Sequence, residues 1–386
     1  MASPSSIDHR LDALVARLQA ESLRGCVVSD ADDIRWLTGF TGSAGVVIVA
    51  ADDPTTARLV TDGRYVDQAA AQLQAVGVAC GIVEQRSVAE ARLEIARAIA
   101  HGGRWGIQMS NMSLAEYEAI VAATSGCGRD VERGDFADVG AILVDLRRTK
   151  DATEIERITV AARIADAALA DTAHLVAAGN TEREVRDALE ASMRRHGADG
   201  VSFETIVASG ENAALPHHRP SDRVLQAGDA VVIDFGALVD GYHSDMTRTF
   251  VIDGPGADAM RERHRVVRES CEAGVALVGP GTRASEVDAA CRRVLAAAGL
   301  EGELTHGVGH GVGLRIHEAP WINARSQDVL RVGDVVTVEP GAYRVGLGGV
   351  RVEELLVVTE TGHLVLSQSP KDPTCPPSPP TTSRTE

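Results

Sequence analysis

Aromatic residues are scarce in this chain of 386 residues, where five Phe, three Trp and four Tyr make up 3% of the sequence. Any hydrophobic core must therefore be built mainly from Ala, Val, Leu and Ile. Basic residues are also short, with 38 Lys and Arg against 55 Asp and Glu. The resulting net charge of −17 argues against nucleic acid or an anionic membrane as the main partner.

The sequence shows the pattern of neither a disulfide scaffold nor a membrane span. The six cysteines form no Cys-x-x-Cys pair, which predicts reduced, mostly buried thiols in a cytoplasmic protein. No stretch approaches the roughly 18 apolar residues of a membrane span. The amphipathic N-terminus lacks the apolar centre of a signal peptide. Length and composition are typical of a globular protein with two domains.

Residues 1–145 alternate helical and strand patterns, which predicts a smaller α/β domain. The expected helices span 8–20, 64–76 and 87–101, and the expected strands span 26–29, 44–50 and 58–61. A charged run then leads into Thr153-x-x-Glu156, which we interpret as a capping box that opens a long helix. This helix would begin a second domain over 150–366. The Pro- and Ser-rich residues 367–386 are expected to be disordered.

The second domain contains a faint repeat with a period of 102 residues. Stretch 175–197 resembles stretch 277–299, and the Leu-Val, Glu-Val, Ala and Gly positions recur in register. Each copy is helical and precedes β-rich sequence. The repeat predicts an α+β domain whose pseudo-twofold halves face one another across a shared sheet.

The stretch THGVGHGVGLRIHE (305–318) combines three histidines with alternating glycines. The alternation matches neither G-x-G-x-x-G nor a P-loop, so a phosphate cradle is disfavoured. Alternating Gly is typical of extended chain that another group approaches closely. We interpret these glycines as space for metal and substrate backbone. Histidines used in this way need partners elsewhere in the chain.

Two carboxylates meet on the hairpin expected around Asp240-Gly241. A two-residue loop there pairs Gly236 with Asp245, so that Asp234 and Asp245 become diagonal neighbours on one face. The missing side chain of Gly236 would leave room between them. Asp234 interrupts the apolar run VVIDF, where an unpaired charge is costly. A metal ion is the preferred compensation, and a buried salt bridge is the alternative.

A matching pair lies in the second half of this domain. Glu339 ends an apolar strand before Pro-Gly, and alternation in VRVEELLVV (350–358) places Arg351 and Glu353 on one face. Glu354 faces the other way and is expected to be structural. With Asp234, Asp245 and His310, the set is four carboxylates and one imidazole. These ligands suit two bridged divalent ions better than one tetrahedral zinc.

These residues resemble the pita-bread metallopeptidases, peptidase family M24, which include methionine aminopeptidase, aminopeptidase P, prolidase and the metal-free creatinase. The shared motifs, in the family's order, are PHHRPSD (216–222), VVIDFG (231–236), GYHSDMTRTF (241–250), THGVGHGVGLRIHE, VEPG (338–341) and RVEEL (351–355). In residues 1–145, DDIRWLTGFTGSAG (32–45) and TDGRYVDQA (61–69) are similar to the proline-directed branch. The resemblance implies a pita-bread domain after a creatinase-like α/β domain.

The resemblance also implies roles for individual residues. The metal ligands would be Asp234, Asp245, His310, Glu339 and Glu353, holding two divalent ions, with Mn²⁺ expected and Co²⁺, Fe²⁺ or Zn²⁺ as alternatives. A hydroxide shared by the ions would attack the substrate carbonyl while Glu339 accepts the proton. His217 and His317 would stabilise the tetrahedral intermediate, His306 would line the proline pocket, and Arg351 would bind a substrate carboxylate or carbonyl. His218 and His243 are expected to be structural or exposed. A homodimer is expected as well.

Four functions remain open at this point. An Xaa-Pro aminopeptidase acting on peptides with proline at position two is slightly favoured over an Xaa-Pro dipeptidase. A third possibility is a metal-dependent amidohydrolase acting on a small non-peptide amide. A non-enzymatic binding module is disfavoured, because such relatives have usually lost metal ligands and this chain retains the full set.

Overall fold

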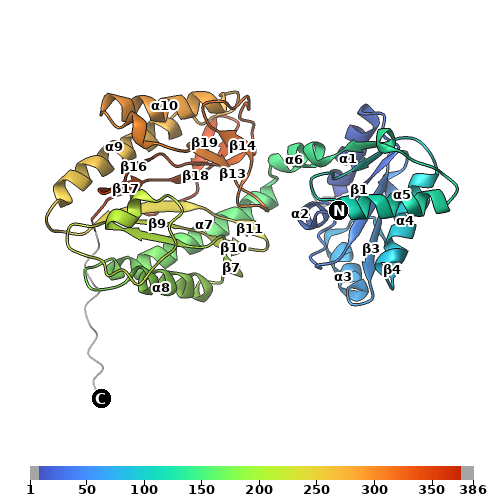
Figure 1. The fold of residues 1–386 in the computed structure, drawn as a ribbon, viewed down its shortest axis with the longest axis horizontal. Helices are drawn as coiled ribbons and strands as arrows, with labels where there is room; N and C mark the ends of the chain where they lie inside the picture. Colours follow the sequence, from blue (N-terminus) through green and yellow to red (C-terminus); the bar gives the residue numbers. More distant parts are fainter. Residues whose placement is uncertain (1–7, 375–386) are drawn as a thin grey trace, which may run out of the picture. The chain divides into compact units, whose positions relative to one another are not determined.

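The computed structural model describes residues 8–374. The chain divides into two compact units, Met1–Arg147 and Arg148–Glu386, shown in Figure 1. Among the described residues, no helix is both long enough and apolar enough to span a bilayer. Cys26, Cys271 and Cys291 are buried free thiols, and Cys375 lies outside the described residues.

The first unit contains a six-stranded sheet in the order β4-β3-β2-β1-β5-β6, flanked by helices (Figure 1). Its strands are β1 (Gly25–Val28), β2 (Val46–Ala50), β3 (Arg58–Asp62), β4 (Gly81–Gln85), β5 (Trp105–Ile107) and β6 (Phe136–Asp138). Its helices are α1 (Asp8–Ala20), α2 (Ala31–Thr38), α3 (Val66–Val76), α4 (Val88–Ala100) and α5 (Leu114–Gly126), and α6 (Gly140–Arg148) ends at the unit boundary. All six elements expected from the sequence are present, which confirms the α/β prediction.

The second unit consists of two similar halves. The first half contains α7 (Ala152–Thr172), α8 (Glu182–Arg195), β7 (Gly200–Val201), β8 (Ile206–Ser209), β9 (Ala230–Phe235), β10 (Ala237–Val239), β11 (Tyr242–His243) and β12 (Met246–Val251). The second contains α9 (Ala257–Val275), α10 (Ala284–Ala297), β13 (Gly309–Gly311), β14 (Glu318–Ile322), β15 (Val335–Val338), β16 (Gly341–Arg344), β17 (Gly348–Arg351), β18 (Glu354–Thr359) and β19 (Gly362–Val365). Helices α9 and α10 lie on one side of the strands and α7 and α8 on the other (Figure 1). The α+β class with two related halves is therefore confirmed.

The two halves do not share one continuous sheet, so that part of the expectation was wrong. Strands β12-β9-β8 form one sheet and β14-β13-β15-β18-β19 form another. Individual hydrogen bonds, from side chains and from the backbone, connect the halves instead of a strand ladder. The Thr249 hydroxyl donates to the Arg351 carbonyl (2.7 Å) and accepts from the Arg351 N–H (3.1 Å).

Aliphatic side chains dominate the cores of both halves, as the shortage of aromatics requires. In the second half, α9 and α10 bury Val267, Val287 and Leu295 against Val336 and Leu356 of the sheet. The main buried cluster of this half contains no aromatic residue. Fully burying one such side chain contributes roughly 1.5–3 kcal/mol, so the helices are held on the sheet mainly by dispersion and hydrophobic burial.

The hairpin around Asp240-Gly241 has the predicted register. Both loop residues have positive φ, 45° and 73°, as a two-residue hairpin turn requires. Val239 pairs with Tyr242, and further along Asp234 pairs with Thr247. This is the register that makes Asp234 and Asp245 diagonal neighbours.

Close packing of backbones explains the glycines near the site, and here the sequence interpretation was wrong. A Cβ on Gly236 would lie 1.8 Å from the Ser244 carbonyl oxygen, so this glycine makes room for the opposing chain. A Cβ on Gly309 would lie 2.1 Å from the Thr337 oxygen, and one on Gly311 would lie 2.2 Å from the Ala319 oxygen. At these three positions a backbone oxygen of an adjacent segment occupies the space that a side chain would need.

Two expectations about the ends of the second unit are corrected. Helix α7 is capped by Asp151, which accepts hydrogen bonds from the N–H groups of Thr153 and Glu154, while the Glu154 carboxylate accepts from the Asp151 N–H. The capping box thus lies two residues before the expected one. The tail is not disordered from residue 367, because the Val251 N–H donates to the Pro373 carbonyl (2.8 Å). Residues 375–386 lie outside the described residues.

A buried carboxylate at the start of α8 holds the segment 209–221. Glu182 is fully buried and accepts six hydrogen bonds. The donors are the N–H and hydroxyl of Ser209, the Asn212 amide, the His218 ring, and the N–H and hydroxyl of Ser221. Burial alone would raise the pKa of Glu182, but these hydrogen bonds outweigh it and lower the pKa from 4.5 to about 2.

Glu182→Gln is expected to destabilise the metal-free protein at neutral pH by about 2 kcal/mol or more, because the NH₂ group of Gln would face hydrogen-bond donors that now bind a carboxylate oxygen. The lowered pKa means that the stabilisation by Glu182 is complete above pH 4.5 and is lost as pH falls toward 2. The free energy of unfolding, measured with urea from pH 7 to pH 3, should fall less steeply with decreasing pH in the variant than in the wild type. The control is Glu184→Gln, an exposed capping carboxylate on the same helix. Equal losses in both variants would contradict this role of Glu182.

Candidate metal centre

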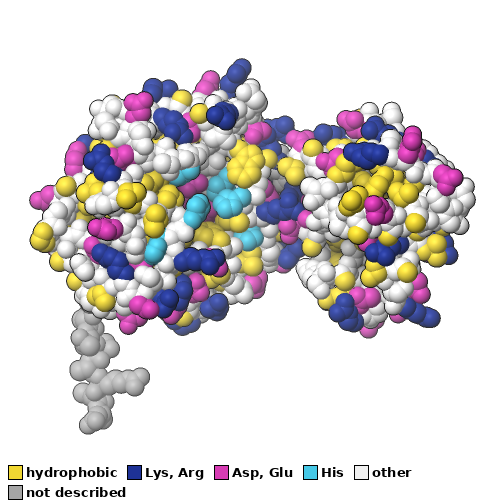
Figure 2. Space-filling model, in the orientation of Figure 1, with side chains coloured by type: hydrophobic (Ala, Val, Ile, Leu, Met, Phe, Trp, Pro, Cys, Tyr) yellow, Lys and Arg dark blue, Asp and Glu magenta, His cyan; other side chains and the backbone are white. Residues whose placement is uncertain are grey.

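The five predicted ligands come from both halves of the second unit. Asp234 lies on β9, Asp245 directly precedes β12, His310 is on β13, Glu339 follows β15, and Glu353 lies between β17 and β18. All of them except Glu353 line one cavity of about 1,100 Å³. Figure 2 shows histidine side chains gathered on the face of this unit turned to the viewer. The fold therefore brings together residues that are up to 119 positions apart in sequence (353 − 234).

Three donors converge tightly. One ligand atom each from Asp245, His310 and Glu353 lies within 4.8 Å of the other two, and all three residues are buried. His310 Nε2 is 3.5 Å from Asp245 Oδ2 and 3.7 Å from Glu339 Oε1. His310 Nδ1 lies 3.0 Å from the Gly311 carbonyl, to which it must donate. The other nitrogen, Nε2, is thereby left as a lone-pair donor directed at the carboxylates.

The charges at this centre repel one another. Burial raises the pKa of Asp245, and the neighbouring Glu353, Asp234 and Glu339 carboxylates raise it further. Burial likewise raises the pKa of Glu339 to about 8, although Arg351 opposes this increase. Burial lowers the pKa of His310 to about 4, so the imidazole is neutral at pH 7, the form that binds metals. Burial and mutual repulsion therefore disfavour the ionised forms of Asp245, Glu339 and Glu353 in the absence of a cation.

The contacts of Asp234 test whether the site fits a metal ion. Arg351 Nη2 contacts Asp234 Oδ2 at 2.5 Å, so the buried salt bridge considered for Asp234 does form. Asp234 Oδ1, however, is buried without a hydrogen-bond partner. An orphaned carboxylate oxygen beside three further carboxylates is the donor set that a divalent cation prefers. The residues present therefore fit divalent metal ions.

A threonine connects Arg351 to Glu353. The Thr247 hydroxyl donates to Glu353 Oε2 (2.8 Å) and accepts from Arg351 Nε (3.0 Å). Outer contacts of this kind orient a ligand carboxylate. Sequence reasoning missed Thr247, although alternation along β12 placed it on the face opposite Arg248.

Tyr343 is a second residue that the sequence analysis missed. Its hydroxyl lies 3.0 Å from His306 Nε2 and accepts from Arg351 Nη1 (2.9 Å). Because His306 Nδ1 donates to the Gly307 carbonyl, Nε2 must accept the Tyr343 proton. His306 is thus fixed in one tautomer at the cavity wall. The only available signal was a lone tyrosine four residues after Glu339.

The remaining histidines separate into two groups. His217 and His317 both line the cavity, and the His317 ring is 4.4 Å from that of His310. His218 also borders the cavity, but its ring bonds to Glu182 (2.8 Å). His243 contacts the Ser202 hydroxyl (2.9 Å). These contacts agree with structural roles for His218 and His243.

Known proteins resemble the chain over nearly its whole length. The family model for metallopeptidase family M24 matches residues 156–360, and the model for the creatinase/prolidase N-terminal domain matches residues 10–149. An Xaa-Pro dipeptidase of Pyrococcus furiosus is 40% identical over 238 residues, covering 62% of this chain and 68% of that protein.

Solved structures extend the similarity to both units. An Xaa-Pro dipeptidase from Bacillus anthracis has a TM-score of 0.88 at 34% identity, covering 96% of this chain and 99% of that one. An X-Pro aminopeptidase from Thermotoga maritima has a TM-score of 0.81 at 31% identity, covering 94% and 99%. Relatives named for either activity therefore have counterparts of both units.

The crowded charges predict an unusual response to Asp245→Asn. Removing one charge should stabilise the metal-free protein at pH 8 by more than about 1 kcal/mol, because it relieves burial and repulsion together. The same change should abolish the rise in Tm that Mn²⁺ produces in the wild type. Thermal unfolding with chelator and with Mn²⁺ measures both effects. Asp253→Asn, at an exposed carboxylate, is the control and should leave both values unchanged. A variant that keeps the full Mn²⁺ response would refute Asp245 as a ligand.

Proposed function

The chain belongs to metallopeptidase family M24, and from this membership we propose that it hydrolyses the bond between an N-terminal residue and proline. The observation that carries the proposal is the convergence of Asp245, His310 and Glu353, with Asp234 and Glu339 beside them, in one buried, over-charged centre. We propose that these five side chains hold two divalent ions, with Mn²⁺ as the expected metal. Two such ions would supply Lewis acidity and a water of lowered pKa.

The side chains around the cavity divide the remaining work. Glu339 accepts the proton of the attacking water and returns it to the leaving proline nitrogen, a role open to a carboxylate that lines the cavity beside the other ligands. His217 and His317 donate to the oxygen on which negative charge develops. Losing one donor of this kind typically costs about 10²–10³ in rate.

The proline side of the substrate faces His306 and Arg351. Tyr343 holds both side chains, because it donates to His306 and accepts from Arg351. The Arg351 guanidinium then offers a positive charge to a substrate carboxylate or carbonyl. His306 presents a neutral ring, since burial lowers its pKa to about 4. The pair favours a cyclic, uncharged residue such as proline on that side of the bond.

Substrate length distinguishes the two forms of this activity. We propose an Xaa-Pro dipeptidase first, supported by the dipeptidase names of the relatives from P. furiosus and B. anthracis. An Xaa-Pro aminopeptidase is the second candidate, supported by the T. maritima structure. The cavity of about 1,100 Å³ is slightly larger than the roughly 300–1,000 Å³ that is usual for small-molecule sites, which favours this second candidate because it suits longer peptides. Homodimer formation and a cytoplasmic location stay predictions.

Hydrolysis of Ala-Pro, Ala-Pro-Ala and a longer Ala-Pro peptide by protein loaded with Mn²⁺ tests the function. Ala-Pro should be cleaved at least tenfold faster than the longer peptides, because only a dipeptide places its free carboxylate near Arg351. A chelator should stop all turnover. Ala-Ala and Ala-Ala-Ala serve as matched controls without proline. If folded, metal-loaded protein cleaves none of the proline peptides, the proposed function is wrong; faster cleavage of longer peptides selects the aminopeptidase.

A further inference from the structure

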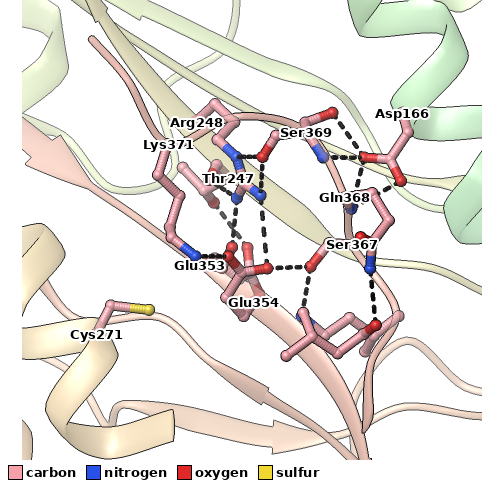
Figure 3. Close-up of polar contacts among 12 residues, drawn as sticks. Asp166, Thr247, Arg248, Cys271, Glu353, Glu354, Ser367, Gln368, Ser369 and Lys371 are labelled. Carbon is pink, nitrogen blue, oxygen red and sulfur yellow. Dashed lines mark hydrogen bonds and ion pairs between the residues drawn. The ribbon is translucent and has the colours of Figure 1, made fainter.

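Arg248 is a fully buried arginine directly behind the metal centre. It lies on β12 between Thr247 and Thr249, and its side chain is 2% exposed. All three guanidinium nitrogens donate hydrogen bonds, and the acceptors come from three separate segments (Figure 3). Burying a guanidinium is costly unless its donors are satisfied. The position of Arg248 therefore depends on all of these segments at once.

Two of its acceptors belong to the metal centre. Arg248 Nη1 donates to the backbone carbonyls of both Thr247 and Glu353. The Glu353 N–H donates to the Thr247 carbonyl (3.2 Å), and the Thr247 hydroxyl donates to the Glu353 carboxylate. Arg248 thus holds the Glu353 backbone in two ways. It binds the Glu353 carbonyl directly, and it binds the Thr247 carbonyl, which accepts from the Glu353 N–H. No strand ladder does this, because Glu353 lies between β17 and β18.

The opposite edge of Arg248 binds the C-terminal segment Ser367–Lys371. Its Nε and Nη2 both donate to the Ser369 carbonyl, at 3.0 and 2.7 Å. Asp166 on α7 fixes the same segment, because its carboxylate accepts from the N–H groups of Gln368 and Ser369 and from the Ser369 hydroxyl. Figure 3 shows this continuous path from Asp166 through Ser369 and Arg248 to Glu353.

Glu354 balances the buried charge. Its carboxylate lies 3.5 Å from Arg248 Nη2 and accepts from the Ser367 hydroxyl and from Lys371 Nζ (2.5 Å). Glu354 thus supplies a buried countercharge to the Arg248 guanidinium. Glu353 and Glu354 therefore face opposite partners, as alternation along the chain predicted.

We propose that Arg248 and the segment Ser367–Lys371 form a clamp that positions Glu353 for metal binding. The inference rests on the proposed function only in taking Glu353 as a ligand. Arg248 is a positioning residue, since it contacts Glu353 through the backbone and does not touch the metal or substrate. The clamp makes the C-terminal segment part of the metal site, although its side chains contribute no ligand. Loosening the segment lowers metal affinity while the five ligands stay in place.

Calorimetric titration of the metal-free full chain with Mn²⁺ tests the clamp. Arg248→Lys keeps the charge but cannot bridge Ser369, Thr247 and Glu353 together, and it should raise the Kd for Mn²⁺ at least tenfold, within the usual 10- to 100-fold effect of residues that support ligands. At saturating Mn²⁺, KM for Ala-Pro should be unchanged. Arg148→Lys is the matched control, at a buried arginine paired with Asp334, and should keep the wild-type Kd. An equal loss in the control would overturn the proposal.

Asp166→Asn provides a second measurement that does not alter the buried arginine. It weakens only the hold on Gln368 and Ser369, and it should raise the Kd by a smaller factor, about threefold or more. If Arg248→Lys does not fold, this variant decides alone. Wild-type Kd values in every folded variant would refute the clamp while leaving the proposed function intact. Failure of the wild type itself to bind Mn²⁺ would instead refute the proposed function.

Discussion

Mutual repulsion among buried carboxylates is the constraint on which this structure depends. Asp234, Asp245, Glu339 and Glu353 are held together out of water, and the Arg351 guanidinium beside them neutralises only part of their charge. Such an arrangement weakens the metal-free fold, because each ionised group lacks both water and sufficient countercharge. It persists only if the surrounding structure is strong enough to enforce it, and a bound cation removes the conflict.

The surrounding structure meets this demand with rigid backbone. Strand β13 fits between β14 and β15 only because Gly309 and Gly311 lack side chains where neighbouring carbonyls approach. His310 is therefore presented from the middle of a sheet and not from a mobile loop. At the other wall of the cavity, Glu182 makes the segment that contains His217 rigid, because it accepts hydrogen bonds from that segment on both sides of the histidine. Aliphatic cores on both sides hold these elements in place.

Local features of the sequence were predictable to the extent that they depend on local chemistry. The two-residue turn at Asp240-Gly241 allowed the register of Asp234 and Asp245 to be counted outward, and alternation separated Glu353 from Glu354. Both results follow from geometry that is the same in every hairpin or strand. The repeat of 102 residues likewise predicted α8 and α10, which begin 102 residues apart (284 − 182).

Contacts between distant segments were beyond such reasoning. Tyr343 and Thr247 contact residues in other segments of the chain, and no spacing in the sequence predicts either contact. The order of residues 367–374 was not predicted, because a high Pro and Ser content is typical of a chain without partners, whereas Asp166 and Arg248 bind Ser369. The glycines of 305–318 were assigned to space for metal and substrate because the sequence does not show which backbone segments pack against them, such as Ala319 against Gly311 and Thr337 against Gly309.

The central claim is that five side chains from two halves hold two metal ions. Anomalous diffraction at the manganese edge, from crystals grown with Mn²⁺, tests it most directly. We expect two peaks about 3.5–4 Å apart, surrounded by Asp234, Asp245, His310, Glu339 and Glu353. A single peak would contradict this claim. So would metal bound away from these side chains while the carboxylates keep the contacts described above.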